Sequence, residues 1–400
     1  MLPLIGSGLN ASTVDLGIVL GAFLIGAGAM QLPAGISAVR FGNRTVSLFG
    51  LVAMSAFTLA SAFSPTWVDL ALLRLGAGAA AAFFFAPALG LVSSYFPAGS
   101  RGPIVGLYNS GFSLGAGVGI FGGALLGDLF GWRASLALGG IVLAGATLGS
   151  ILLLPRSEDV RASTGWRAAW TAGLPVLRSR SLWALAIALT GFWAAAYIAA
   201  QYFVNYSSAV HPSWGLEVAA GVTTLLIVAQ IFGGPIGGWL GERSRDMRRL
   251  LLVAGASCGL LTCAIPFLPL EGVWPLMAAL GFVIGVIFAV QYLLPTYLRG
   301  TRGRGVALSL ALLNSVQIFA GSGLAIGFAV VATGAGYTVA WLFAGAIALA
   351  TLPTLLWVES GRGGANEAAG RSVTGGGPSP LRDRPGSPSS SGDPRPDSRR

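Results

Sequence analysis

Eleven apolar stretches, each about 20 residues long, fill most of the chain and constrain its fold more than any other feature. A stretch of this length can cross the hydrocarbon core of a bilayer as a helix. A helix also satisfies its backbone N–H and C=O groups within one segment, as lipid requires. The stretches are 15–37, 46–64, 67–95, 103–127, 133–154, 181–206, 217–240, 249–269, 273–297, 305–332 and 336–358. We therefore predict an all-α, polytopic membrane protein.

The charged residues agree with a chain that lies mostly in lipid. Only 10% of the residues are charged and 54% are hydrophobic, whereas a soluble domain carries about 25% charged residues. The net charge of +10 raises the alternative of a nucleic-acid partner. The basic residues are spread over many loops, so we expect no such partner. With one His, and with Cys258 and Cys263 inside one apolar stretch, we expect no metal and no cofactor.

Arginine is concentrated in every second loop. One set of loops holds fifteen arginines, whereas the other set holds Arg133 beside Asp69, Asp128, Glu217 and Glu271. The positive-inside rule places the arginine-rich loops in the cytoplasm of a cell whose inner membrane the chain spans. The tail 359–400 falls on the same side, and we predict that it is disordered because it lacks apolar residues. The fifteen are Arg40, Arg44, Arg101, Arg156, Arg161, Arg167, Arg178, Arg180, Arg243, Arg245, Arg248, Arg249, Arg299, Arg302 and Arg304.

The two halves of the chain match at an offset of 203 residues. Gly35 and Arg40 recur as Gly238 and Arg243, and the pair at 101–102 recurs at 304–305. Parallel repeats of this kind are a recurrent plan of transporters. We predict an N-terminal bundle at 1–154 with five visible helices, a cytoplasmic central loop at 155–180 and a C-terminal six-helix bundle at 181–358. The counterpart of helix 181–206 falls before Met1, so we expect the chain to lack the first helix of its plan.

Several motifs resemble landmarks of the major facilitator superfamily. Segment 31–44 resembles the loop between helices 2 and 3 of that family, which usually reads Gly-x-Leu-x-Asp-Arg-x-Gly-Arg. Segment 238–243, Gly-Trp-Leu-Gly-Glu-Arg, is its second copy and retains an acid. Segments 73–80, 96–102 and 131–133 resemble the Arg-x-x-x-Gly motif of helix 4 and two landmarks around helix 5. The matching gating residues are Gly35, Arg40, Gly42, Arg44, Gly238, Glu242 and Arg243, and Arg74 with Gly78 matches in helix 4.

The resemblance implies two six-helix bundles related by a parallel pseudo-repeat, and a secondary carrier that works by alternating access. The sequence shows no nucleophile–base pair, paired carboxylates, phosphate loop or metal cluster, so we expect no enzyme activity. Two positions depart from the family pattern. Val39 replaces the Asp of the 2–3 loop, which in the family belongs to a charge relay that stabilises the outward-facing state. The alternative is that Arg40 and Arg44 serve topology alone. Ile120 stands where many drug–proton antiporters carry a Pro, which counts against drug efflux.

Arg74 is the one charged residue well inside a predicted span. It lies about 10 Å from the outer end of its helix, at 1.5 Å per residue. A guanidinium at that depth should face the bundle interior and meet an anion, a carbonyl or water. One interpretation is a bidentate contact with the carboxylate of a solute. The alternative is an arginine that snorkels outward or holds its helix to a neighbour.

Polar side chains inside the spans are the other substrate-binding candidates. Three of them share one face of the helix 181–206 at positions i, i+4 and i+8. For each candidate the alternative is a hydrogen bond between helices or an interfacial belt. The candidates are Tyr197, Gln201, Asn205, Gln291, Asn314, Gln317 and Asn109.

These features leave three functions open. The first is a secondary carrier for a small organic solute, with an organic anion favoured by Arg74. The second is an efflux carrier for lipophilic compounds, and the third, of another class, is a membrane receptor that does not transport. No Asp or Glu lies deep in a predicted span, so the coupling ion stays open. We expect a monomer whose partners are a small-molecule substrate and the lipid bilayer.

Overall fold

The fold is seen in a computed structural model, which describes residues 2–97, 99–155, 165–298 and 305–358. Within these residues the secondary structure is helical and contains no strand. The arginines of the predicted loops at 156, 161, 299, 302 and 304, and the tail predicted from 359 to 400, lie outside the described residues. The prediction of an all-α, polytopic membrane protein is confirmed.

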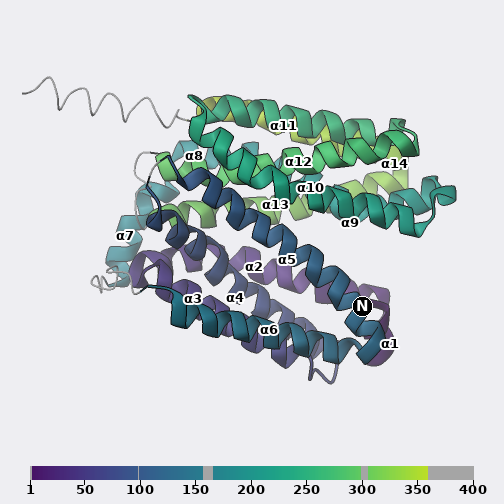
Figure 1. Ribbon diagram of the computed structural model, residues 1–400, viewed down its shortest axis with the longest axis horizontal. Helices are drawn as coiled ribbons and strands as arrows, with labels where there is room; N and C mark the ends of the chain where they lie inside the picture. Colours follow the sequence, from purple (N-terminus) through teal and green to yellow (C-terminus); the bar gives the residue numbers. More distant parts are fainter. Residues whose placement is uncertain (1, 98, 156–164, 299–304, 359–400) are drawn as a thin grey trace, which may run out of the picture. The chain divides into compact units, whose positions relative to one another are not determined.

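The helices follow the predicted stretches closely, and Figure 1 labels them along the chain. Ten helical spans within the described residues are long and apolar enough to cross a membrane, with α8 and α9 counted as one. Helix α5, some of whose side chains are not described, occupies the remaining predicted stretch, 103–127. The helices are α1 (Leu2–Leu9), α2 (Thr13–Phe41), α3 (Asn43–Ser61), α4 (Trp67–Tyr95), α5 (Arg101–Phe130), α6 (Trp132–Leu153), α7 (Trp166–Leu177), α8 (Arg180–Ala188), α9 (Thr190–Val210), α10 (Leu216–Arg243), α11 (Met247–Ala264), α12 (Leu270–Leu293), α13 (Gly305–Ala335) and α14 (Tyr337–Thr351).

Local sequence explains where these helices begin and end. Ser12 caps α2, because its hydroxyl accepts from the amide of Asp15 while the Asp15 carboxylate accepts from the amide of Ser12. Single glycines with φ between 82° and 87° join α2 to α3, α5 to α6 and α13 to α14. Other residues rarely adopt this backbone conformation, so Gly42, Gly131 and Gly336 each allow one helix to end and the next to begin at once.

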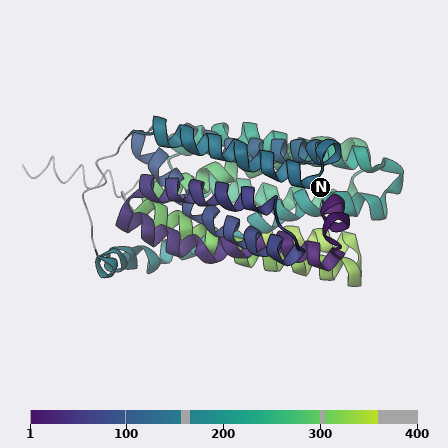
Figure 2. The same cartoon turned by 90° about the horizontal axis from the view of Figure 1, so that it is seen from below.

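Small residues let the helices approach closely within the membrane. A Cβ atom added at Gly26 or Gly78 would overlap backbone atoms of the facing helix, so α2 and α4 touch along their backbones. The same holds for α10 and α12 at Gly233 and Gly281. The helices of the two pairs run side by side in both views (Figures 1 and 2). The described helices belong to one compact unit. The predicted division into two bundles at 155–180 stays a prediction.

Three elements were not foreseen from the sequence. The predicted central loop contains a 12-residue helix, α7. The stretch 181–206 forms two helices, α8 and α9, that meet at Leu189. The first residues form the short helix α1, in which Ile5 and Leu9 pack with Leu70 and Trp132.

Candidate functional site

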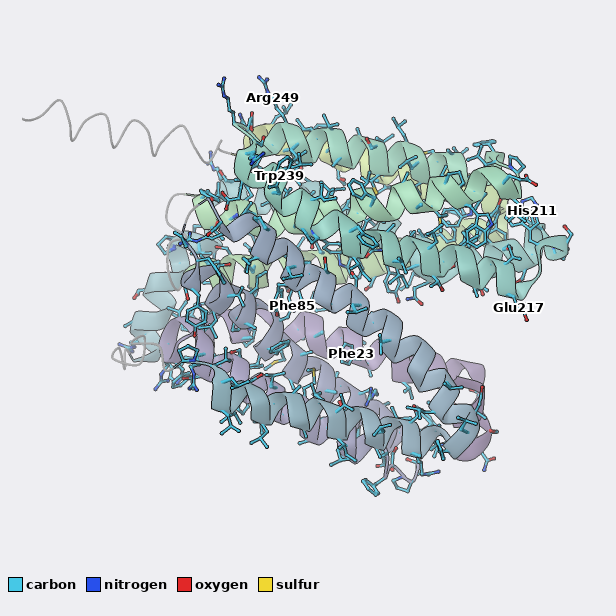
Figure 3. All side chains as sticks on the ribbon, in the orientation of Figure 1. Phe23, Phe85, His211, Glu217, Trp239 and Arg249 are labelled. Atoms are coloured by element: carbon cyan, nitrogen blue, oxygen red, sulfur yellow. The ribbon has the colours of Figure 1, made fainter. Side chains whose placement is uncertain are left out.

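The two ends of the helices carry opposite charges. We call the end that holds Arg40, Arg243 and Arg249 the basic end. We call the opposite end, which holds Asp69 and Glu217, the acidic end. Figure 3 shows Arg249 at one end and Glu217 at the other. The candidate residues can therefore be located by their depth from either end.

Helices α5 and α10 are in close contact near the basic end. A Cβ atom at Gly102 would overlap the carbonyl oxygen of Gly238, and one at Gly106 would overlap that of Gly234. The hydroxyl of Ser110 donates to the carbonyl of Ile231 at 2.7 Å. The two backbones are therefore in direct contact. We call this line of contact the α5–α10 seam, and it is closed in this structure.

Helices α2 and α13 form a second closed seam at the same depth. A Cβ atom at Gly35 would lie 2.9 Å from Ala311 Cβ and 2.9 Å from Leu308 Cα. Seven residues further into α2, the carbonyl of Gly28 accepts from the hydroxyl of Ser315 at 3.2 Å. The predicted gating residues Gly35 and Gly238 therefore each lie in a seam.

Toward the acidic end, the faces of α2, α5 and α13 that form these two seams are no longer in close contact with the opposite helix. Gly17 and Gly21 lie on the stripe of α2 that contains Gly28 and Gly35, yet an added Cβ atom there would meet nothing within 4 Å. On the α5 stripe, the nearest atom to a Cβ at Gly117 is 3.8 Å away. On α13, Ile326 continues the stripe and is 66% exposed. The structure is thus closed at the basic end and open toward the acidic end.

Arg74 lies seven residues into α4, about 10 Å from the acidic end. Its Nε and Nη2 atoms are buried, and neither has a hydrogen-bond partner among the described residues. Phe85, eleven residues or about three turns further, shares this face of α4. The Phe85 ring contacts Tyr108 of α5 and Tyr292 of α12, at centroid distances of 5.6 and 5.7 Å. The face that carries Arg74 is therefore turned toward α5 and α12.

The predicted stripe on α9 is largely uncovered. Gln201 and Asn205 are exposed, and neither makes a hydrogen bond with the described residues. Tyr197 is half-buried and stacks on Trp193 with the ring centroids 5.3 Å apart. Gln201 lies nine residues from the end of α9, about 13 Å from the acidic end. Gln201 and Arg74 thus lie at similar depths, on different helices.

The remaining polar candidates are buried side chains that form hydrogen bonds between helices. The amide nitrogen of Gln317 donates to the amide oxygen of Gln291 at 2.8 Å. The hydroxyl of Tyr292 donates to Asn314 at 2.7 Å. Asn109 donates to the carbonyl of Phe288 at 3.4 Å and to that of Val105, in its own helix, at 3.2 Å.

This group lies near the basic end. Gln291 stands two residues from the end of α12, some 20 Å deeper than Arg74 along the helix axes. A small solute cannot span that separation. The group and Arg74 are therefore two separate polar regions. Within the group, the Nε2 of Gln291 and the Oε1 of Gln317 have no hydrogen-bond partner among the described residues.

The gating motifs make unequal contacts in the two halves. Glu242 is buried and accepts from the amide of Gly102 at 2.9 Å and from the hydroxyl of Tyr297 at 2.7 Å. It therefore caps the N-terminus of α5 from α10. Val39, its counterpart, lies instead in an apolar cluster with Val176 of α7 and Leu308 of α13.

The arginines of these motifs contact aromatic rings and helix ends. The Arg40 guanidinium lies 4.4 Å from the centre of the Trp166 ring, and that of Arg243 lies 4.2 Å from the Trp239 ring. Arg44 donates to the carbonyl of Leu154, where α6 ends, at 3.3 Å. The contact to Trp166 could not be read from the sequence, because it depends on α7.

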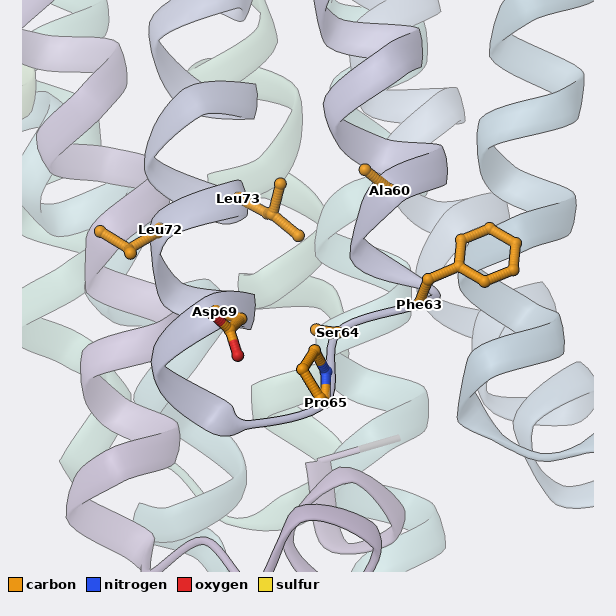
Figure 4. Close-up of a pocket in the computed structure, with 7 residues that line it drawn as sticks. All are labelled: Ala60, Phe63, Ser64, Pro65, Asp69, Leu72 and Leu73. Atoms are coloured by element: carbon orange, nitrogen blue, oxygen red, sulfur yellow. The ribbon is translucent and has the colours of Figure 1, made fainter.

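A shallow hollow of about 380 Å³ lies at the acidic end between α3 and α4. Asp69, Leu72 and Leu73 line it from α4, as Figure 4 shows, with Phe63 and Pro65 from the preceding turn. These α4 residues lie on the side of the helix away from Arg74. Its one charged lining group is a carboxylate, so this hollow is unsuited to an anion.

Comparison with known proteins identifies the class. Residues 1–322 match the sequence profile of the Major Facilitator Superfamily. The chain therefore belongs to this superfamily, and it is a multi-pass membrane transporter. The resemblance inferred from the sequence motifs is confirmed.

Individual relatives differ in how much of the chain they match. The gallate transporter of Pseudomonas putida is 28% identical over 380 residues, which cover 85% of this chain and 83% of that protein. Monocarboxylate transporter 11 of Mus musculus is 34% identical over 258 residues, 60% of this chain and 55% of that protein. Among solved structures, the fucose:proton symporter of E. coli superimposes with a TM-score of 0.72 at 17% identity, covering 90% of this chain and 93% of that one. The similarity to the fucose:proton symporter shows a shared fold and nothing about the solute.

Proposed function

We propose that the protein is a secondary carrier for a small organic anion, and that Arg74 binds the carboxylate of this solute. The observation that carries the proposal is the buried guanidinium with two nitrogens that have no hydrogen-bond partner among the described residues. A charge inside a membrane span is costly unless it is paired. A solute carboxylate could pair with both nitrogens at once, which is the strongest geometry available to arginine.

The position of Arg74 fits an entry site. It lies on the side of the molecule that is open, about 10 Å from the acidic end. The stacked rings of Trp193 and Tyr197, and the amide of Gln201, offer an aromatic wall and hydrogen bonds to the rest of a solute. The names of two relatives, a gallate transporter and a monocarboxylate transporter, support a carboxylate as the transported group.

In alternating access, the end of the protein that is open would then change from the acidic end to the basic end. In the proposed cycle the solute enters from the acidic end, and the α5–α10 and α2–α13 seams part to release it at the basic end. We propose that the basic end faces the cytoplasm of a cell whose inner membrane holds the protein as a monomer. The arginine bias supports this orientation.

Thermal unfolding of the detergent-purified protein tests the binding step. A ligand at 100 times its dissociation constant should add about 2.7 kcal/mol of apparent stability. We expect gallate or 4-hydroxybenzoate to raise the unfolding midpoint of the wild type but not that of Arg74→Gln. Arg133→Gln is the matched control, because Arg133 lies at the acidic end and donates to the carbonyl of Ser64 at 3.0 Å.

Two outcomes would overturn the proposal. One is an Arg74→Gln variant that responds to carboxylates as the wild type does. The other is a wild type that responds to lipophilic cations and to no anion, which would favour an efflux carrier.

A further inference from the structure

Helix α7 carries one apolar stripe that is only half covered by protein. Trp166, Trp170, Gly173 and Leu177 follow one another at i, i+4, i+7 and i+11, so they share one side of the helix. At the C-terminal half of α7, Gly173 lies against Leu308 of α13, since a Cβ atom there would be 2.8 Å from Leu308 Cδ2.

The covered half of α7 packs against both α2 and α13 at the basic end. Val176 is buried in a cluster with Ile36 and Val39 of α2 and with Leu308 of α13. Helix α7 therefore covers the α2–α13 seam at the place where the family pattern would put a charge and this chain has Val39. Figure 1 shows α7 lying across this end.

In the N-terminal half of the same stripe the tryptophan rings are only partly covered by the described residues, with the Phe41 ring edge-on to Trp166 at a centroid distance of 5.7 Å. Trp166 is 50% exposed and Trp170 is 48% exposed. Because these rings continue the stripe that rests on the ends of α2 and α13, they lie at the level where the spanning helices end. That level is the boundary between the hydrocarbon core and the headgroups, where tryptophan is enriched.

Two arginines supply positive charge at this exposed half. The Arg40 guanidinium lies against two rings, 4.4 Å from the centre of Trp166 and 4.6 Å from that of Phe41. It makes no hydrogen bond or ion pair with the described residues. Ring contacts leave the N–H donors of a guanidinium free at its edges. Arg167, the neighbour of Trp166, is exposed.

We propose that these residues form a binding surface for anionic phospholipid of the leaflet at the basic end. The aromatic–basic surface consists of Arg40, Phe41, Trp166, Arg167 and Trp170. The arginines bind the lipid phosphate, and the tryptophan rings lie at the edge of the acyl chains. Because the other half of α7 covers the α2–α13 seam, the bound lipid also favours the conformation that is closed at the basic end.

The test is thermal unfolding in detergent micelles that contain a rising fraction of phosphatidylglycerol or of phosphatidylcholine. We expect phosphatidylglycerol to raise the unfolding midpoint of the wild type well above the shift that phosphatidylcholine gives. In Arg40→Gln/Arg167→Gln, the lipid fraction for a half-maximal shift should rise about thirtyfold, equivalent to ~1 kcal/mol for each arginine. Trp166→Ala/Trp170→Ala should lose most of the shift.

Matched variants separate this surface from general effects of lipid. Trp357, in the 3-10 helix Leu352–Trp357 that follows α14, is 75% exposed, and no described guanidinium stacks on it. Trp357→Ala should keep the full response, and Arg40→Lys/Arg167→Lys should keep most of it. Equal shifts with the two lipids, an unchanged response in Arg40→Gln/Arg167→Gln, or the same shift with soluble glycerol phosphate would each overturn the proposal.

Discussion

The closed seam between α5 and α10 can be tested with one methyl group. A Cβ atom at Gly106 would overlap the carbonyl oxygen of Gly234 and lie 2.8 Å from the Cα of Pro235. Both are backbone atoms, so no side-chain rotation can relieve the overlap, and the helices must separate. Gly117 lies on the same stripe of α5, but its nearest neighbour, Ile227 Cγ2, is 3.8 Å away. Gly117→Ala is therefore a control in the same helix.

Overpacking of this kind costs roughly 1–3 kcal/mol. This cost destabilises only the conformation in which the basic end is closed, because the α5–α10 seam parts when the basic end opens. The equilibrium should then shift toward an open basic end by about 5- to 150-fold. Gly117→Ala should leave the equilibrium unchanged and add some helix stability, since alanine is the better helix former.

A buried cysteine on the second seam reports the shift. Ser315→Cys places a thiol where α2 meets α13, in a background with Cys258→Ala and Cys263→Ala. We expect a water-soluble maleimide to label this thiol about 5- to 150-fold faster in Gly106→Ala than in the wild type. Equal labelling in Gly106→Ala and Gly117→Ala would refute the argument, because the two seams would then not open together.

Two carboxylates near the basic end give further predictions. Glu242→Gln removes the charge that accepts from Gly102 and Tyr297, so it should weaken closure by ~1 kcal/mol and speed the same labelling about fivefold, whereas an unchanged rate would assign Glu242 no part in closure. Burial raises the pKa of Asp246, but hydrogen bonds from Arg248 outweigh it, so the net pKa lies below the ordinary value of 3.8. A lowered pKa stabilises the fold above that value, and this contribution is lost as the pH falls through the pKa of the folded state. Acid unfolding followed by circular dichroism should therefore show a smaller loss of stability below pH ~4 in Asp246→Asn than in the wild type, and an identical loss would contradict the assignment.

The sequence was sufficient to predict the spans, because length and apolar content alone decide what can cross a bilayer. It also singled out Arg74, since a charge inside a span is costly and therefore informative. It could not separate Gln201 from Gln317. Both lie on a polar face of a helix, and periodicity gives the face but not what lies against it. The structure places Gln201 at an uncovered surface and Gln317 in a hydrogen bond to Gln291.

The basic end was less predictable. Helix α7 is 12 residues long and contains Pro175, so it is too short for the criterion that found the spans. The role of Val39 depends on α7, because its apolar side chain packs near Val176, far along the chain. The sequence therefore indicated a missing charge at position 39 but not the apolar contact found there.

Flux into liposomes tests the central claim most directly. Purified protein would be reconstituted, and uptake of labelled gallate would be followed in vesicles preloaded with unlabelled gallate, so that exchange needs no coupling ion. We predict exchange by the wild type and by Arg133→Gln, and its loss in Arg74→Gln. Exchange at the wild-type rate in Arg74→Gln would contradict the account, because the carboxylate would then be bound elsewhere.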